Sequence, residues 1–202
     1  MTEINLTHED KDRELVELCR KGDTGAFELL VRNYQKKMFN MAFRITGSTE
    51  DAAEVVQDSF VSAYRNLKNF EARSRFSTWL YAITVNTARN RLSQTRTRDR
   101  HETNSLDDPS PIDKNMKKFE PASGDASALD LLSRKEQQEK VQECLNRLDQ
   151  EFREVIVLRD IQGFSYEEIS AMLSIAAGTV KSRIYRARDS VKNCLKKIWG
   201  DR

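Results

Sequence analysis

The sequence predicts an all-α protein of two small helical domains joined by a flexible linker. Gly and Pro are scarce, at seven and three of 202 residues, and strand-like alternation is hard to find. Apolar residues recur at helical spacing on both sides of one polar stretch, residues 98–130. This stretch holds all three prolines and few apolar groups, so it cannot bury enough surface to offset its ordering entropy. We therefore expect a first domain at 10–97, a flexible acidic linker at 98–130 and a second domain at 131–202.

The first domain opens with two predicted helical segments in residues 22–47, which share one apolar stripe. We expect this stripe to pack in the core, through Phe27, Leu30, Val31, Tyr34, Met38, Met41, Ala42 and Ile45. A further helix should begin at Ser48, because Ser48 and Asp51 have the spacing of a capped helix start. Its buried face should contain Ala52, Val56, Phe60, Ala63 and Leu67.

An acidic stripe follows the outer side of this predicted helix. Asp51, Glu54 and Asp58 fall at positions i, i+3 and i+7, with Gln57 beside them. Taken alone, the stripe fits an ordinary solvated helix face as well as it fits a functional surface.

In residues 70–98, aromatic side chains are interleaved with arginines and amides. On a helix from about Ser77, Trp79, Asn86 and Asn90 can share one face, close to Arg89 or Arg91. Rings stack on bases, guanidinium groups hold phosphate and amides read base edges, so this composition is typical of single-strand recognition. Some of these aromatics must be core. We assign Phe76 and Leu80 to the core and leave Trp79 between the core edge and a nucleic-acid contact.

Residues 163–188 predict a helix-turn-helix that ends in a basic recognition helix. Ser165 should cap the first helix, with Glu168 completing a capping box, and the break at 174–178 has the length of the turn. The second helix should begin near Thr179, whose hydroxyl can cap it. Its inward face should be Val180, Ile184, Ala187 and Val191. The outer side then carries Lys181, Ser182, Arg183, Tyr185, Arg186 and Arg188.

Charge is segregated along the chain. From Gly178 to the C-terminus there are eight Lys/Arg against two Asp/Glu, a local +6 in a chain of net +2. A helix with one apolar face and dense basic donors on the other suits a DNA major groove, the alternative being a solvated Lys/Arg-rich terminal helix. Residues 89–100 form a second basic patch, with five arginines against one aspartate. Two separated basic surfaces predict two contacts with one polyanion.

The sequence lacks the features of a membrane-spanning or secreted protein and those of an enzyme. No apolar run is long enough to span a bilayer and the N-terminus does not resemble a signal peptide, so we expect a cytoplasmic protein. Cys19, Cys144 and Cys194 are far apart and odd in number, which predicts isolated reduced thiols. No phosphate loop, metal cluster or catalytic triad is visible. The sequence therefore predicts neither an active site nor a cofactor.

The order of the motifs resembles a known family. DAAEVVQDSFVSAY, FSTWLYAITVNTARN, a polar tether, LRDIQGFSYEEISAML and GTVKSRIYRAR are together similar to the extracytoplasmic-function (ECF, group 4) sigma factors of bacterial RNA polymerase, nearest to the sigma-E type. The resemblance implies that residues 10–97 are sigma region 2 and residues 131–202 are sigma region 4. It covers both domains. One departure lies in the turn, where Ala176 stands in place of a frequent proline.

The resemblance also implies roles for individual residues. The core polymerase surface, for the clamp coiled coil of the large subunit, is Asp51, Glu54, Gln57 and Asp58. For the downstream (−10) DNA surface the resemblance implies that Asn86 helps to hold a flipped base and that the loop from Phe70 to Arg75 forms its pocket, with Arg73 and Ser74. The composition described above adds Trp79, Arg89, Asn90 and Arg91 to this predicted surface. The upstream (−35) DNA surface is Arg159, Thr179, Lys181, Ser182, Arg183, Tyr185, Arg186 and Arg188.

The family further implies a monomeric, non-enzymatic protein of the stress response. Its partners would be core RNA polymerase, through the clamp coiled coil and the flap of the large subunit, promoter DNA and an anti-sigma factor. A conventional helix-turn-helix regulator that senses a ligand is the first alternative, and it would be a dimer on palindromic half-sites. A non-DNA helical adaptor is the second, and it leaves the +6 tail unexplained.

Overall fold

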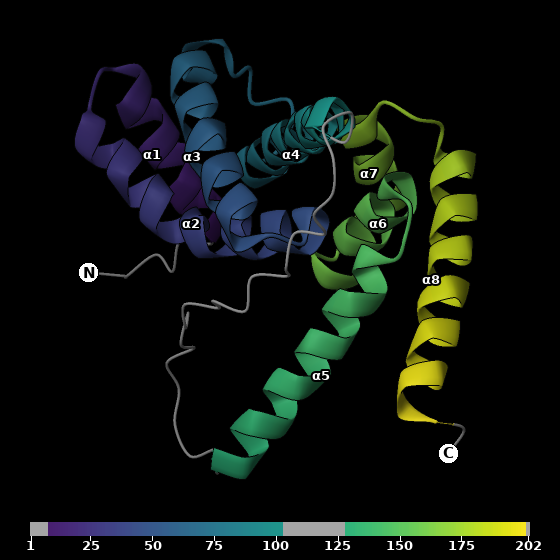
Figure 1. Ribbon diagram of the computed structural model, residues 1–202. Helices are drawn as coiled ribbons and strands as arrows, with labels where there is room; N and C mark the ends of the chain where they lie inside the picture. Colours follow the sequence, from purple (N-terminus) through teal and green to yellow (C-terminus); the bar gives the residue numbers. More distant parts are fainter. Residues whose placement is uncertain (1–7, 103–127, 201–202) are drawn as a thin grey trace.

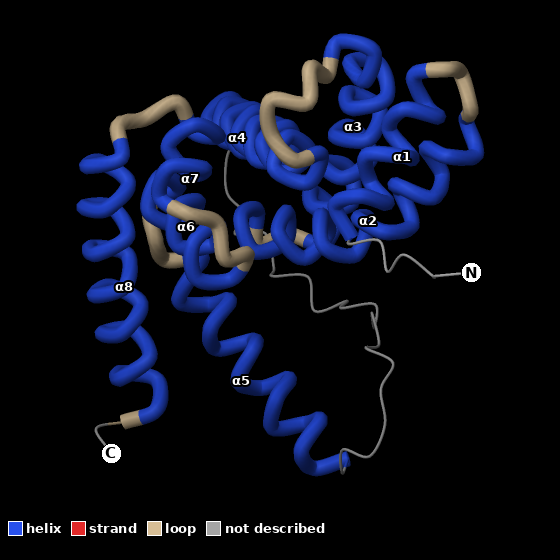
Figure 2. Tube along the Cα trace, turned by 180° about the vertical axis from the view of Figure 1, so that it is seen from behind, coloured by secondary structure: helices blue, strands red, loops and turns tan. Residues whose placement is uncertain are grey.

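The computed structural model describes residues 8–102 and 128–200, and every regular element in these ranges is helical (Figure 1). The elements are α1 (His8–Arg20), α2 (Thr24–Thr46), α3 (Thr49–Asn66), η1 (Leu67–Asn69), α4 (Phe76–Glu102), α5 (Ala128–Asn146), α6 (Gln150–Ile156), η2 (Val157–Ile161), α7 (Tyr166–Leu173) and α8 (Ala177–Trp199). Figure 2 shows the same helices from behind, with short loops between successive helices inside each of the two described ranges. The all-α prediction is confirmed.

Local capping explains where the first helices begin. The Asp23 carboxylate accepts a hydrogen bond from the Ala26 backbone N at 3.1 Å and caps α2. The stretch 22–47 was predicted as two segments but forms one continuous helix, because its only internal glycine lies in the first turn and the apolar stripe is uninterrupted. Ser48 caps α3 as predicted, by accepting from the Asp51 backbone N at 3.2 Å.

Gly47 ends α2 and touches the second domain. Its φ of 77° lies in the left-handed region that favours glycine. A methyl group built on Gly47 would lie 2.6 Å from the Oδ1 of Asn146, at the end of α5. Asn146 is itself held by Gln142, whose Nε2 donates to this Oδ1 at 2.8 Å.

The core of the first domain follows the predicted apolar faces. Phe76 and Leu80 are buried, which confirms their assignment. On α2 and α3 three predicted core residues are only half-buried, namely Phe27, Val31 and Val56. The remaining predicted residues, on α2, α3 and η1, are buried: Leu30, Tyr34, Met38, Met41, Ala42, Ile45, Ala52, Phe60, Ala63 and Leu67.

The second domain contains the helix-turn-helix. The predicted capping box of α7 is present, since Ser165 Oγ accepts from the Glu168 N at 3.1 Å and Glu168 Oε2 accepts from the Ser165 N at 2.8 Å. Ser174 then turns the chain in the left-handed region, with φ 53°.

The recognition helix α8 starts earlier than predicted. It begins at Ala177, and its N-cap, Ala176, offers no side-chain hydrogen bond. The prediction that Thr179 caps this helix is therefore wrong, because Thr179 already lies within the first turn. The inward face is as predicted, with Val180, Ile184 and Ala187 buried and Val191 half-buried.

The cysteines depart from the prediction. Cys144 on α5 and Cys194 on α8 form a disulfide with a Cα–Cα distance of 5.8 Å, so the prediction of isolated reduced thiols is wrong for this pair. Fifty positions separate them in the chain, and only the packing of α5 against α8 brings them together. Cys19 is free and half-buried, in agreement with the prediction.

The two domains pack directly on each other. α4 lies against α7, and α2 lies against α5, α6 and η2 (Figure 1). One continuous apolar cluster extends through both domains. Helix α4 extends to Glu102 and α5 begins at Ala128, so the helices enter both ends of the predicted 98–130 linker. The rest of the predicted linker, residues 103–127, lies outside the described residues.

Candidate polymerase and nucleic-acid interfaces

The acidic stripe lies on the solvent side of α3. Glu54, Gln57 and Asp58 are exposed and Asp51 is half-buried, whereas Ala63 on the opposite side is buried. The buried side fixes α3 to the core. The stripe is therefore an anionic surface on a rigid element, which can attract a basic partner.

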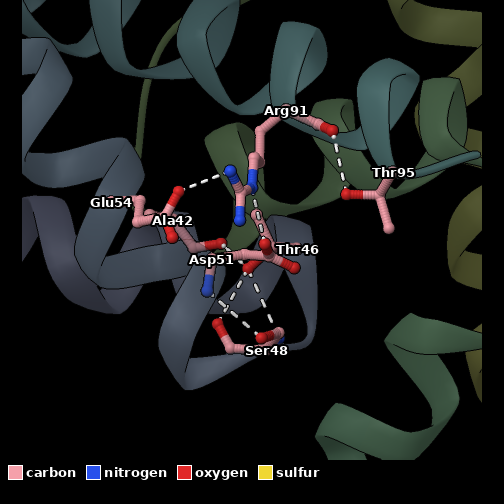
Figure 3. Close-up of polar contacts among 7 residues, drawn as sticks. All are labelled: Ala42, Thr46, Ser48, Asp51, Glu54, Arg91 and Thr95. Atoms are coloured by element: carbon pink, nitrogen blue, oxygen red, sulfur yellow. Dashed lines mark hydrogen bonds and ion pairs between the residues drawn. The ribbon is translucent and has the colours of Figure 1, made fainter. Parts of the chain in front are cut away.

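Arg91 of α4 closes over the N-terminal end of this stripe (Figure 3). Its Nε donates to Asp51 Oδ1 at 2.7 Å, and its guanidinium also pairs with Glu54. The hydrogen bond to Asp51, aided by the charges of Asp51 and Glu54, raises the pKa of Arg91. The structure thus joins one residue assigned to downstream DNA with two assigned to the polymerase surface.

The loop between η1 and α4 combines buried aromatics with exposed cations. The Phe70 ring is buried against Trp79 at a centroid distance of 4.9 Å and against Phe76 at 6.1 Å. Trp79 is half-buried, so its packing fits the core-edge alternative. Ala72 has a left-handed φ of 55°. The neighbouring side chains of the loop point to solvent, namely Arg73, Ser74 and Arg75.

Helix α4 presents its predicted DNA contacts on three sides, one of which is the side of Arg91 toward α3. Asn86 and Asn90 are both exposed, as a base-reading role requires. Arg89 instead points at the second domain, where its Nε donates to Glu154 Oε2 at 2.8 Å. Glu154 is only 1% exposed, so this pair is protected from solvent on the carboxylate side.

The outer face of α8 is a cationic ridge with one prominent aromatic. Lys181, Ser182 and Arg186 are exposed, and Tyr185 is 76% exposed. Thr179, at the helix start, is half-buried. A face of this kind can enter a major groove without rearrangement of the helix.

Three further predicted upstream contacts are engaged within the domain. Arg183 is half-buried and pairs with Glu151 of α6. Arg188 pairs with Asp160 through two hydrogen bonds, of 2.6 and 2.9 Å, and the first cause of its raised pKa is this contact. Arg159 donates to the Phe164 carbonyl at 2.7 Å. These three arginines are held by contacts within the domain and are therefore less available to bind DNA than Arg186.

Polar contacts across the domain boundary were not identified from the sequence. Arg153 is buried, and its Nη1 donates to the Ile45 carbonyl at the end of α2 at 2.8 Å. Thr78 donates to Glu168 at 3.5 Å, and the rings of Tyr81 and Phe164 meet at 4.9 Å. The only sequence signal was a charged pair, Arg153 and Glu154, placed directly before the apolar run at 155–158.

An apolar groove lies between α5, α6 and α8. Its volume is about 790 Å³, and its lining includes Ile156, Val191, Leu195 and Trp199. Trp199 is 46% exposed. The same lining carries cations, so the groove suits an apolar segment with acidic flanks.

The described residues offer neither a membrane-spanning helix nor a cluster of metal ligands. None of the described helices is long and apolar enough to cross a membrane. Within residues 8–102 and 128–200, no group of His, Cys, Asp and Glu side chains could hold a metal ion.

Two family descriptions match the two domains separately. Residues 30–98 match Sigma-70 region 2, and residues 138–191 match Sigma-70, region 4. The chain is 34% identical to the RNA polymerase sigma-H factor of Pseudomonas aeruginosa over 94% of its own length and 96% of that protein. It is 38% identical to the ECF RNA polymerase sigma-E factor of Escherichia coli K12, with 90% and 93% covered.

Two solved structures resemble the whole chain. One is CnrH in complex with the cytosolic domain of CnrY, with a TM-score of 0.65, 26% identity, and 93% of this chain and 99% of that chain covered. The other is the sigma factor RpoE with the anti-sigma factor NepR from Bartonella quintana, with a TM-score of 0.63, 28% identity, and 87% and 98% covered. With both regions matched in order along nearly the whole chain, this protein belongs to the sigma-70 family of RNA polymerase sigma factors, in its ECF group.

Proposed function

We propose that this protein binds core RNA polymerase and directs initiation at promoters whose −10 and −35 elements it reads with separate surfaces. One observation carries the proposal. The chain exposes two unlike faces. One comprises the amides Asn86 and Asn90 of α4 and the cationic 70–75 loop that precedes this helix, and the other is the basic ridge of α8. A ligand-sensing regulator would need only the second of these faces.

The two faces suit different forms of DNA. The ridge around Lys181 and Arg186 fits the major groove of an intact duplex. Asn86 and Asn90 can form hydrogen bonds with base edges that have left the stack. Extruding a base costs a few kcal/mol, which these contacts offset. Strand opening is then driven by binding, and the polymerase performs the chemistry.

The acidic stripe and the groove suit protein partners. The stripe at Glu54, Gln57 and Asp58 can dock on the clamp coiled coil of the polymerase large subunit. The groove beneath α8 can accept an apolar segment such as the flap. The structural relatives are described in complex with the anti-sigma factor NepR and with the cytosolic domain of CnrY. An anti-sigma factor is therefore a proposed partner here, in a cytoplasmic stress response.

Promoter binding requires the two domains to separate. The −10 and −35 elements lie about 25 base pairs apart, roughly 80 Å of duplex at about 3.4 Å per pair. A compact chain of 202 residues has a radius of gyration of only about 17 Å. The contacts of Arg89 with Glu154 and of Arg153 with Ile45 must therefore break when both elements are engaged.

Reconstitution with core RNA polymerase tests this function. The purified protein should give defined transcript starts on genomic DNA fragments, and sequencing of these starts should reveal both elements. Core polymerase alone serves as the control. Transcript starts that do not differ from those of core polymerase would refute the proposal.

A further inference from the structure

The disulfide between Cys144 and Cys194 lies where the recognition helix is otherwise weakly held. The first half of α8 is anchored by Val180, Ile184 and Ala187, all buried. Between residues 188 and 200 no side chain of α8 is fully buried, and the apolar groove runs along this half. The bond to Cys144, a residue 1% exposed on α5, is therefore the firmest attachment of the second half of α8.

We propose that this pair is a reversible thiol–disulfide switch, closed by a hydroperoxide and opened by a dithiol, that sets how firmly the second half of α8 is held. The site is an inference from the structure alone. Only its effect on transcription rests on the proposed function. Disulfides are rare where cells keep thiols reduced, and those that do form there are usually transient or redox-sensing. Bacterial transcription takes place in such a compartment.

The two sulfurs differ in access, which gives the reaction an order. Cys194 is half-buried and lies next to Leu195, a residue of the groove lining, whereas Cys144 is shielded. Lys197 lies three positions after Cys194, on the same side of α8. Positive charge nearby stabilises the thiolate that attacks.

Closure consumes one hydroperoxide. The Cys194 thiolate attacks the peroxide, the O–O bond breaks, and a sulfenic acid forms on Cys194 while the departing oxygen is protonated to water or alcohol. The Cys144 thiolate then attacks this sulfur, the S–O bond breaks and water leaves after protonation. The two thiols lose two electrons and the peroxide gains them. A dithiol reverses the reaction by attacking Cys194 first, releasing the Cys144 thiolate and becoming oxidised itself.

Cys19 provides an internal comparison. Burial, together with the nearby charge of Asp23, raises the pKa of its thiol. It is also the free cysteine of the described residues. Cys19 should therefore react slowly with peroxide and remain a thiol in both states.

Thiol counting on the full chain tests the chemistry. Protein reduced with dithiothreitol should bind three maleimides by mass spectrometry, and protein treated with stoichiometric hydrogen peroxide should bind one, at Cys19. Dithiothreitol should restore three without denaturant. Cys144→Ser and Cys194→Ser should abolish this cycle, and the matched control Cys19→Ser should keep it. Three labelled thiols after peroxide, or a bond that resists the dithiol under native conditions, would overturn the proposal.

Hydrogen exchange tests the mechanical effect. Reduction opens a loop of 50 residues, and we expect the Tm to fall by about 5 °C or more. Amide exchange should accelerate in residues 188–199 and remain unchanged in residues 180–187. Equal exchange of residues 188–199 in the two states would overturn the proposal.

Transcription by the holoenzyme separates this inference from the proposed function. Promoter-directed initiation should differ at least twofold between oxidised and reduced protein, and this difference should vanish in Cys144→Ser. Equal initiation in the two states would overturn the coupling of the switch to α8. If neither state initiates at promoters, the sigma function fails, while the thiol count and the exchange still decide whether the switch exists.

Discussion

At the residue scale, ion pairs decide which cations are available to DNA. Arg89, Arg91, Arg183 and Arg188 are each engaged by a carboxylate of the same chain. Arg186, by contrast, is exposed. A paired arginine must give up its carboxylate before it can meet a phosphate or a base, so the net gain from DNA is smaller.

Arg186 and Arg183 should therefore differ as DNA contacts. Arg186→Ala should weaken upstream-duplex binding by about 1–3 kcal/mol and relax specificity at one position, as expected for a guanine contact. Arg183→Ala should weaken binding less and lower the stability of the second domain slightly, because its partner Glu151 is left alone. Competition binding with single-base promoter variants measures both. An equal loss on every sequence for Arg186→Ala would mean that it grips only the backbone.

Asn86 should act in strand opening. Asn86→Ala should change the free energy of unfolding by no more than about 0.5 kcal/mol, because the side chain is exposed. Open-complex formation on duplex promoters should fall, and a promoter already unpaired at the −10 element should recover part of the loss. Permanganate footprinting measures the opening, with the exposed Gln94→Ala as the control. Unfolding of the Asn86 variant would make Asn86 a structural residue.

At the element scale, local sequence predicted helix starts well where a side chain makes the cap. Ser48 and Ser165 act as expected because the partner amide lies three residues away. The start of α8 was missed because no side chain caps it, and Ala176 carries no such signal. The faces of α3 and α8 were predicted by helical periodicity. The partners of their charged residues were not, because pairs such as Arg91 with Asp51 join different helices.

The acidic stripe should determine affinity for core polymerase. Reversal of Asp51, Glu54 and Asp58 to lysine should weaken core binding. The loss of affinity should be larger at low salt, because added salt screens the attraction between exposed charges. Asp58→Lys alone is the cleanest variant. Reversal of Asp51 or Glu54 also breaks the pair with Arg91 and should destabilise the fold by about 1 kcal/mol. Fluorescence titration with core polymerase measures the affinity. If the triple variant binds as tightly as the unchanged protein, the stripe is an ordinary solvated helix face.

At the scale of the whole molecule, sequence composition indicated two domains but gave no sign that they pack together. Their contact depends on pairs 65 to 108 positions apart, such as Arg89 with Glu154 and Arg153 with Ile45. Periodicity and capping carry no information on contacts at that distance. The disulfide was missed for the same reason.

Arg89→Ala should open the molecule. It leaves the buried Glu154 carboxylate with Gln150 as its remaining partner, which should disfavour the packed arrangement by about 1–3 kcal/mol. Small-angle scattering should show a larger radius of gyration. Arg91→Ala is the matched control, because Arg91 lies on the same helix but pairs within the first domain. An unchanged radius for Arg89→Ala would mean that apolar contacts alone hold the domains together.

Two independent features of the structure favour glycine at position 47. Its left-handed backbone disfavours any side chain, and Asn146 occupies the space that a side chain would fill. A double-mutant cycle separates the cost of the left-handed backbone from the cost of the clash with Asn146, since Asn146→Ala removes the neighbouring side chain and leaves the backbone as it is. Gly47→Ala should be less harmful in that background than alone. Over evolutionary drift, residues 47 and 146 should then change together, and a sequence that loses the glycine should also lose the asparagine.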